Sequence, residues 1–178
     1  MGRTLAEDMT ASRAPELDVG AAYAAHGEHV WRSLHRLGVA AADLADLTQE
    51  VFVVVHRRRA DYDPSRSMRG WLWGICVGLA RNHRKRAFHH AEQLVDAPDR
   101  AVSGDAEGEL DTRRRAALGR RVLAELDPER RAVFVMFEVE GMSGRAIAEA
   151  LEVPIGTVHS RLHAARAELA AALGQEEA

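Results

Sequence analysis

The sequence has little cysteine, little lysine and few aromatic residues, and these shortages exclude several classes of structure. Its single cysteine, Cys76, can form no disulfide within the chain and cannot by itself hold a structural zinc ion. Aromatic residues make up only 5% of the chain, and no uncharged run approaches the ~20 residues that a membrane-spanning helix needs. We therefore expect no membrane insertion and a fold that rests on an aliphatic core.

The beginning of the chain lacks the features of a secretory signal. Glu7 and Asp8 are acidic and no apolar segment follows them, so we expect the protein to stay in the cytoplasm. A length of 178 residues suits one ordinary domain or two small ones and excludes a large catalytic barrel.

Charge is distributed unevenly along the chain, although the net charge is only −3. Residues 54–90 contain 9 basic and 2 acidic residues, a local excess that attracts phosphate. Residues 91–112 contain 1 basic and 7 acidic residues, together with a proline and two glycines, and this composition is typical of a flexible linker. The sequence therefore predicts two modules joined by an acidic linker.

The apolar residues recur at helical spacing, which predicts an all-α protein. In the first module, residues 19–90, three stripes are present: Tyr23, Val30, Leu34 and Leu37, ending at Gly38; Leu44, Leu47, Val51 and Val55, with Asp43 as N-cap; and Met68, Leu72, Ile75 and Leu79. The β-branched run from Val51 to Val55 could also form a strand. Its continuation from Leu44 at helical spacing favours a helix.

The third predicted helix carries arginines and a tryptophan on the side opposite its apolar stripe. This side gathers Arg66, Arg69, Trp73, Val77, Arg81 and Arg84. Such a face can simply be solvated, with Trp73 covered by a neighbouring helix. It can also bind single-stranded nucleic acid, because arginines follow the backbone while an indole stacks on a base. The basic charge of residues 54–90 favours the second interpretation.

The second module, residues 113–173, has the pattern of a helix-turn-helix. Asp127, Pro128 and Glu129 form a helix start, and Gly141 predicts the end of that helix. A short helix capped by Ser143 then precedes a longer one, which in this motif enters the DNA major groove. The longer helix places Val158, Leu162, Ala165 and Leu169 inward and Gly156, Ser160, His163 and Ala167 outward, with Thr157 and His159 beside them.

No pattern in the sequence indicates a metal site, a cofactor or a catalytic centre. His159 and His163 are four residues apart, but no third ligand is near them. The segment from His26 to His29 lacks the two-residue spacer of the zinc-protease motifs. We therefore expect no enzyme activity, and an RNA-binding protein or a metal-dependent enzyme remains a remote alternative.

Five motifs in order closely resemble the extracytoplasmic-function group of bacterial sigma factors. They are Asp46–Phe52, Trp71–Ile75, Leu126–Val133, Ile147–Leu151 and Gly156–Leu162. The resemblance implies a region 2 module over residues 19–90, which binds core RNA polymerase and melts the minus-10 promoter element. It also implies a region 4 module over residues 113–173, which reads the minus-35 element, with residues 91–112 as linker.

The same resemblance implies roles for individual residues. Asp46, Gln49 and Glu50 fall on the segment that docks on the largest polymerase subunit. Residues Arg59–Met68 match a loop that captures a flipped base, and Trp71 matches a family tryptophan, whereas periodicity favours Trp73 for stacking. The minus-10 candidates are Arg59, Tyr62, Arg66, Arg69, Trp71, Trp73, Arg81, Arg84 and Lys85, and the minus-35 candidates are Thr157, His159, Ser160, Arg161 and His163.

The sequence departs from the family pattern at four positions. Gly78 replaces the usual Asn, Asn82 the common Asp, Ala146 the Glu of a capping box with Ser143, and Glu152 the usual turn glycine. The resemblance implies promoter DNA, core polymerase and an anti-sigma factor as partners. The alternative is a helix-turn-helix regulator that acts without polymerase, which leaves the motif from Asp46 to Phe52 unexplained.

Overall fold

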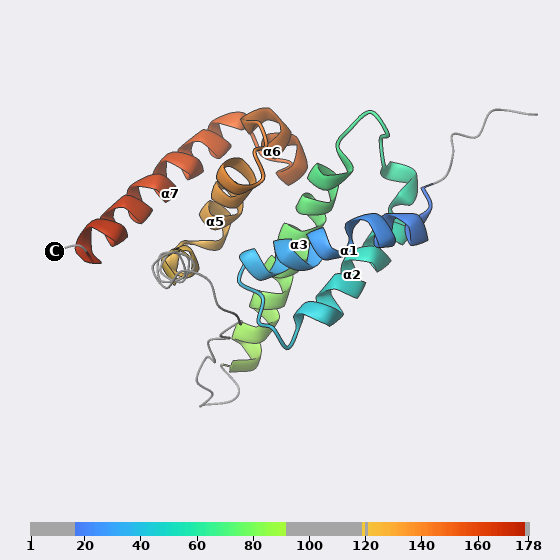
Figure 1. Ribbon diagram of the computed structural model, residues 1–178, viewed down its shortest axis with the longest axis horizontal. Coiled ribbons are helices and arrows are strands. Elements are labelled where there is room, and N and C mark those ends of the chain that lie inside the picture. The colour runs from blue at the N-terminus through green and yellow to red at the C-terminus, as the bar shows by residue number, and fades with distance from the viewer. Residues whose placement is uncertain (1–16, 92–118, 120, 177–178) are drawn as a thin grey trace, which may run out of the picture.

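The computed structural model describes residues 17–91, 119 and 121–176, and its helices form two groups (Figure 1). The first group contains α1 (Val19–Arg36), α2 (Leu44–Arg57), the 3-10 helix η1 (Arg59–Asp61) and α3 (Met68–Ala91); the second contains α5 (Pro128–Phe134), the π-helical turn η2 (Val135–Val139), α6 (Gly144–Leu151) and α7 (Ile155–Glu176). These residues include no strand, which confirms the all-α prediction. None of the helices described is long and apolar enough to cross a membrane. The predicted linker lies outside the described residues, apart from Ala91.

Local signals set both ends of α1. The carboxylate of Asp18 accepts hydrogen bonds from the backbone N–H groups of Gly20 and Ala21 at 2.9 and 3.1 Å. After α1 the chain turns at Gly38, whose φ of +87° is strained for residues with a side chain. One prediction for α1 is wrong: Tyr23 is 51% exposed and does not belong to the buried stripe.

The second segment is a helix and not a strand. Leu44, Val51 and Val55 of α2 are completely buried, as their helical spacing predicted. Asp43 occupies the N-cap position, but its side chain makes no capping hydrogen bond. Its carboxylate lies 3.3 Å from Nε2 of His83 on α3 instead. A contact between helices has therefore replaced the local cap that the sequence indicated.

The second group of helices follows its predicted caps closely. Asp127 accepts hydrogen bonds from the backbone N–H groups of Glu129 and Arg130 at 3.0 and 3.3 Å, and Pro128 opens α5. Ser143 caps α6 through the backbone N–H of Ala146 at 3.2 Å. Glu152 then adopts a left-handed conformation with φ of +55°, which costs roughly 1–2 kcal/mol for a residue other than glycine. This tight turn leads directly into α7.

Helices α6 and α7 form the predicted helix-turn-helix, and α5 packs on α7. Val158 and Ala165 of α7 are completely buried, and Leu162 is 5% exposed. His163 and Ser160 lie exposed on the opposite side. The predicted inward and outward faces of α7 are both confirmed.

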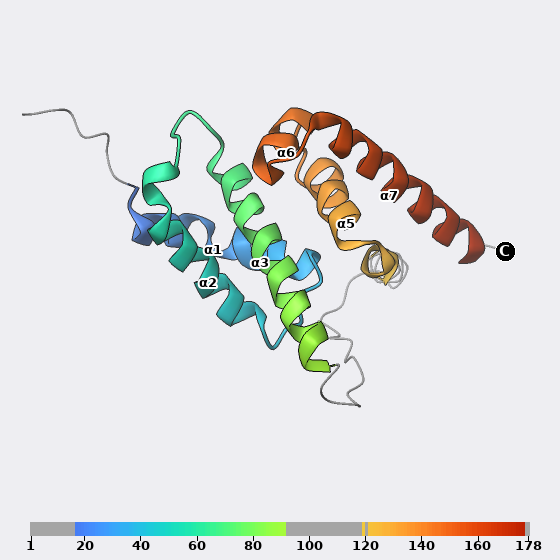
Figure 2. The same ribbon diagram turned by 180° about the vertical axis from the view of Figure 1, so that it is seen from behind.

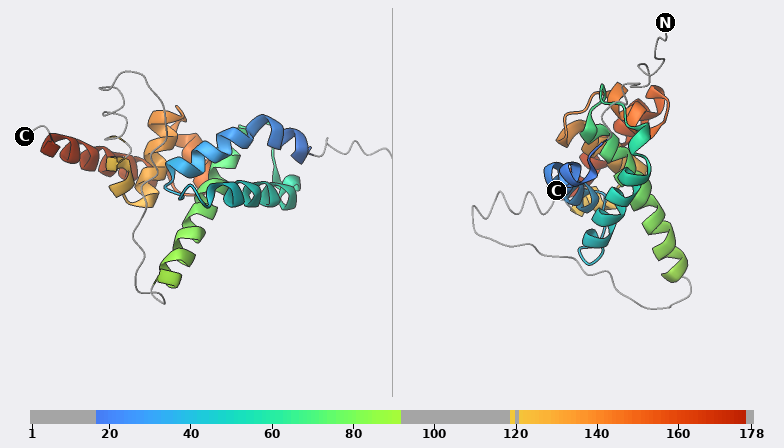
Figure 3. Two further views of the ribbon diagram at one scale, coloured as in Figure 1. Left: turned by 60° about the horizontal axis from the view of Figure 1, so that its bottom comes forward. Right: turned by 90° about the vertical axis from the view of Figure 1, so that its right-hand side faces the viewer.

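Helix α3 is the part of the first group that meets the second, with α1 and α2 packed on it from one direction and α6 from another (Figures 1 and 2). Its C-terminal turns extend beyond the other helices (Figure 3). The prediction that Trp73 is exposed on α3 is wrong, because its side chain is buried and its ring lies 6.3 Å from the ring of His29 on α1. Because α3 is covered from more than one direction, Trp73 is buried although Arg66, Arg69 and Arg81 of the same predicted face are exposed.

Candidate nucleic-acid and polymerase interfaces

The outer side of α2 presents a stripe of polar residues that ends in an exposed valine. Asp46 and Gln49 are exposed and Glu50 is half-buried, with its carboxylate 3.7 Å from Nη2 of Arg86 on α3. Val53 continues the same stripe and is 47% exposed. The sequence analysis missed Val53, although its position seven residues after Asp46 places it on the same helical face. The structure thus brings the three predicted docking residues together with an apolar neighbour.

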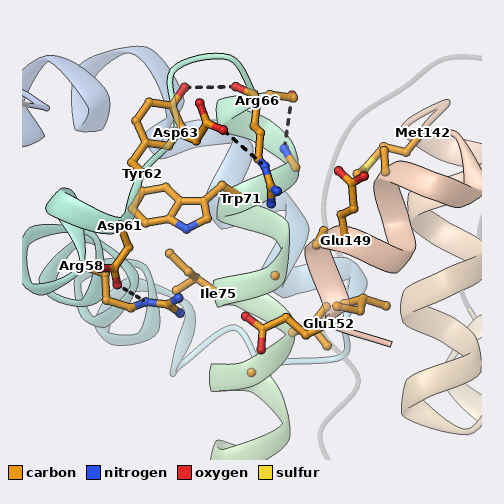
Figure 4. A pocket seen from close by; sticks show the side chains of 18 of the residues that line it. Arg58, Asp61, Tyr62, Asp63, Arg66, Trp71, Ile75, Met142, Glu149 and Glu152 are labelled. Atoms are coloured by element: carbon orange, nitrogen blue, oxygen red, sulfur yellow. Dashed lines mark hydrogen bonds and ion pairs between the residues drawn. The ribbon is translucent and has the colours of Figure 1, made fainter. Parts of the chain in front are cut away.

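A cleft of about 590 Å³ opens beside α3, between the segment before this helix and α6 (Figure 4). Two aromatic rings line it: those of Tyr62 and Trp71, whose centroids are 5.1 Å apart with an angle of 39° between their planes. The hydroxyl of Tyr62 donates a hydrogen bond to the carbonyl of Arg66 at 3.2 Å. On α3, therefore, Trp71 and not the buried Trp73 borders an open surface.

Arginines from three parts of the chain line the same cleft. Nε of Arg66 lies 3.6 Å from the carboxylate of Asp63, and Arg81 extends from α3. Arg58, which the sequence analysis did not select, pairs with Asp61 at 3.3 Å. Its place in the run of three arginines from Arg57 to Arg59, at the end of α2, was the sequence signal for it. Arg58 and Arg66 thus each lie beside an aspartate near the rings, in ion pairs that are largely exposed.

The loop before α3 is ordered by Asp63. Its carboxylate accepts a hydrogen bond from the backbone N–H of Ser65 at 2.9 Å, and hydrogen bonds from Ser65 lower the pKa of Asp63 below its usual value. The loop therefore keeps a negative charge at neutral pH and holds the nearby arginine in place.

Four other predicted minus-10 residues do not line this cleft. Arg59 donates to the carbonyl of His56 at 2.8 Å, and Arg84 donates to the carbonyl of Leu37 at 3.4 Å. Arg69 and Lys85 are exposed on α3. The predicted basic residues are thus divided between those that line the cleft and those that lie elsewhere on η1 and α3.

The outward side of α7 carries small and polar groups. His159, Ser160 and His163 are exposed, and Thr157 is half-buried with its carbonyl accepting from the Ser160 hydroxyl at 3.0 Å. Arg161 is different, because its guanidinium forms an ion pair with Glu129 at the start of α5. The structure therefore directs Arg161 toward its own module.

The histidine pairs do not gather further metal ligands. Within residues 17–91 and 121–176, no three His, Cys, Asp or Glu side chains come together as a metal site. Burial lowers the pKa of His29, and the nearby carboxylate of Glu140 opposes this shift only in part. His29 is therefore neutral at physiological pH.

Both helical groups match parts of one protein family. Residues 22–88 match the family described as Sigma-70 region 2, and residues 120–169 match that described as Sigma-70, region 4. The chain is 36% identical over 148 residues to the ECF RNA polymerase sigma factor SigE of Mycolicibacterium smegmatis, covering 81% of this chain and 57% of that relative. It is 32% identical over 163 residues to the RNA polymerase sigma factor CnrH of Cupriavidus metallidurans, covering 86% and 85%.

A solved structure of CnrH in complex with the cytosolic domain of CnrY has the same arrangement of helices. The similarity has a TM-score of 0.63 at 26% identity and covers 88% of each chain. Sigma factors are non-catalytic subunits that direct RNA polymerase to promoters. The chain belongs to this class, the sigma-70 family, and within it to the extracytoplasmic-function group. The predictions of a sigma factor and of a protein without catalysis are confirmed.

Proposed function

We propose that three separate surfaces of this sigma factor divide the work of initiation. The stripe on α2 docks on core polymerase, the cleft beside α3 holds unpaired minus-10 DNA, and the outward side of α7 reads the minus-35 element. The cleft is the observation that carries the proposal, because it places two aromatic rings beside several arginines.

The chemistry of the cleft suits a single strand. Aromatic stacking contributes about 1–3 kcal/mol per base, and it is open only to a base that has left its duplex partner. Tyr62 and Trp71 supply the rings, while Arg58 and Arg66 supply positive charge for the phosphates. Stabilising the unpaired base favours the open promoter without any catalytic step in this chain.

The docking stripe and the recognition helix have different chemistry. Asp46 and Glu50 offer negative charge, with Val53 as an apolar contact, which suits a basic protein surface and repels DNA. On α7, Ser160 and His163 offer short polar side chains that can approach base edges in the major groove. Polymerase and promoter therefore bind to different sides of the molecule.

An anti-sigma factor is a further proposed partner. CnrH was solved bound to the cytosolic domain of CnrY, and its fold matches this chain over most of its length. We also propose that the protein acts in the cytoplasm, where promoter DNA and polymerase are.

Replacement of Asp46, Gln49 and Glu50 together by Ala tests the docking surface. These side chains make few contacts within the protein, so the variant should stay folded while its affinity for core polymerase falls by about tenfold or more. The measurement is a fluorescence anisotropy titration of labelled sigma factor with core enzyme. Glu28→Ala is the matched control, because Glu28 is an exposed carboxylate on α1. Unchanged core affinity in the triple variant would contradict the docking assignment.

A further inference from the structure

A second cavity lies along α3 beyond the cleft, where this helix meets the second group. It has a volume of about 100 Å³, and its walls come from the end of α1, from α3 and from the helices of the second group. Its aliphatic walls are Leu37, Val77, Ala80, Ala132, Leu151 and Val153. Ala80 of α3 and Ala132 of α5 are 8% and 0% exposed. A molecule in this cavity would therefore lie mostly against hydrocarbon.

Charged side chains border the same cavity. Arg161 and Glu129 line it together, and their ion pair balances their charges. Arg81 and Arg84 of α3 also line it, and no ion pair between described residues includes either of them. Arg81 is exposed and borders the cleft as well, whereas Arg84 is half-buried. The cavity therefore has an excess of positive charge, and Arg84 is the less exposed of its two unpaired arginines.

A further arginine lies directly behind Arg84. Nη2 of Arg84 donates to the carbonyl of Leu37 at 3.4 Å, and Nη1 of Arg131 donates to the same oxygen at 3.3 Å. A Cβ atom added at Gly38 would collide with Nη1 of Arg131 and would lie 3.7 Å from Nη2 of Arg84. Two guanidinium groups thus converge on one neutral acceptor at the end of α1.

The charges of these two arginines are not balanced by a nearby free carboxylate. Arg131 is only 6% exposed, and burial together with the charge of Arg84 lowers its pKa, while Asp127 opposes the shift. The Asp127 carboxylate already accepts hydrogen bonds from the start of α5. Nε of Arg131 is buried and donates to no atom of the described residues. An anion beside Arg84 would reduce this repulsion in a place that is shielded from water.

The size and the walls of the cavity select the kind of anion. A water occupies about 30 Å³ in the liquid, so the cavity has room for about three waters or for a molecule of a few non-hydrogen atoms. Aliphatic walls favour a hydrocarbon chain, because burying the chain removes apolar surface from water. A guanidinium binds a carboxylate through two parallel hydrogen bonds. A phosphate within a DNA strand is attached to a sugar on both sides and is too large to enter.

We propose that this cavity binds a short-chain aliphatic carboxylate, whose charged group meets Arg84 and whose chain lies against Val77 and Ala132. The site goes beyond the proposed function and gives Arg84 a partner other than promoter DNA. Because the walls come from both helical groups, the bound carboxylate contacts both. It stabilises the folded chain by mass action, since the unfolded chain has no such cavity.

Butyrate is the probe, and a heteronuclear NMR titration of the full chain without polymerase is the measurement. Butyrate should shift the backbone amide signals of Val77 and Ala132 until they saturate. We expect a Kd of about 1–10 mM, since the ligand has only six non-hydrogen atoms. Absence of saturable shifts at these two residues would overturn the proposal.

Two related ligands separate the contributions of charge and chain. Formate has the charge without the chain, and butyramide has the chain without the charge, so each should bind at least about tenfold more weakly than butyrate. Equal affinity for formate would indicate an adventitious anion only. Equal affinity for butyramide would mean that the arginine takes no part. Either result would overturn the proposal.

Arg84→Gln tests the charged end of the site. Glutamine can still donate to the Leu37 carbonyl, so the variant should stay folded while its affinity for butyrate falls by about tenfold or more. Lys85→Gln is the matched control, because it removes an exposed positive charge from the next position, outside the cavity. Its affinity should stay within about twofold of the parent's. Equal losses in the two variants would reduce the effect to general electrostatics and overturn the site.

Ala80→Leu tests the apolar end, because the larger side chain fills the cavity. It should remove the shifts caused by butyrate, while circular dichroism shows that the helices are kept. Butyrate should also raise the melting temperature of the parent and not that of Arg84→Gln. Parental butyrate affinity in a folded Ala80→Leu protein would place the ligand elsewhere. None of these measurements involves polymerase or promoter, so failure of the carboxylate site would leave the proposed function as it stands.

Discussion

Helices α3 and α7 are the two long helices that carry the proposed DNA surfaces. They differ in how well their sequences predict which face of the helix is buried. On α7, the predicted inward residue Val158 is buried and the predicted outward residue His163 is exposed. On α3, the predicted outward residue Trp73 is only 1% exposed. Helical periodicity identifies a buried face when a helix packs on one side. It fails at Trp73 because α3 packs against more than one helix, and the Trp73 ring lies 6.3 Å from the ring of His29 on α1.

The largest expected effect is a difference in stability between variants of the two tryptophans of α3. Trp73→Ala should lower the free energy of unfolding by about 3–5 kcal/mol, because it empties a buried site. Trp71→Ala should cost much less, since its side chain is only half-buried beside the open cleft. Urea unfolding followed by circular dichroism gives both values. Equal losses would show that the two positions are buried alike.

The same two variants should rank in the opposite order when promoter opening is measured: Trp71→Ala should impair opening more than Trp73→Ala. Trp71→Ala should reduce open-complex formation by about 1–3 kcal/mol if one stacked base is lost, while closed-complex formation stays near normal. Permanganate footprinting of thymines measures the opening. A promoter mismatched across the minus-10 element should recover part of the defect, because its bases are already unpaired. Normal opening by a folded Trp71→Ala protein would remove Trp71 from the site.

On α7, base readout can be separated from packing within one turn. His163→Ala should change the preference at one or two base pairs of the minus-35 element by about 1–3 kcal/mol. Arg161→Ala should leave relative preferences unchanged, because Arg161 pairs with Glu129. Competition binding across a set of single-base promoter variants measures both. An altered base preference in Arg161→Ala would show that Arg161 contacts DNA and does not only pair with Glu129.

The two aspartates that precede α5 and α2 offer a comparison of caps. Asp127→Ala should destabilise the protein by about 1 kcal/mol, because two backbone N–H groups lose their acceptor. Asp43→Ala should cost less, since Asp43 makes no capping hydrogen bond and its pair with His83 is partly exposed. Thermal melts of both variants test the ranking, and a larger loss for Asp43→Ala would contradict it.

The smallest expected effect is a pH dependence from His29. Burial lowers the pKa of His29 in the folded protein below the ordinary value of 6.5; Glu140 opposes this shift, whereas Arg69, His26 and Arg32 add to it. The unfolded chain therefore takes up a proton first as the pH falls, so this contribution to stability is complete above pH 6.5 and decreases below it. Melting temperatures between about pH 7.5 and 5.5 should show a shallower decrease for His29→Gln. An identical slope would exclude His29 as the source.

Several features of the fold follow from short stretches of sequence. The caps at Asp127 and Ser143 and the stop at Gly141 were predictable because a helix end is satisfied by atoms within a few residues. The shared outer face of Asp46, Gln49 and Glu50 was also predictable, because these residues recur at helical spacing on α2, and their docking role stays a prediction. The sequence predicted only some of the residues that line the cleft: Tyr62, Arg66, Trp71 and Arg81 were minus-10 candidates, and Arg58 was not.

The sequence by itself determined the helices, most of their ends and the family to which the chain belongs, since these depend on local hydrogen bonding, apolar spacing and contiguous motifs. Only the tertiary structure decided that Asp43 pairs with His83, that Trp73 is buried, and that Glu140 meets Arg36 across more than a hundred residues. Such contacts join segments whose approach costs loop entropy and is repaid by packing over the whole molecule. Periodicity along one helix contains no information about which neighbour covers its second face.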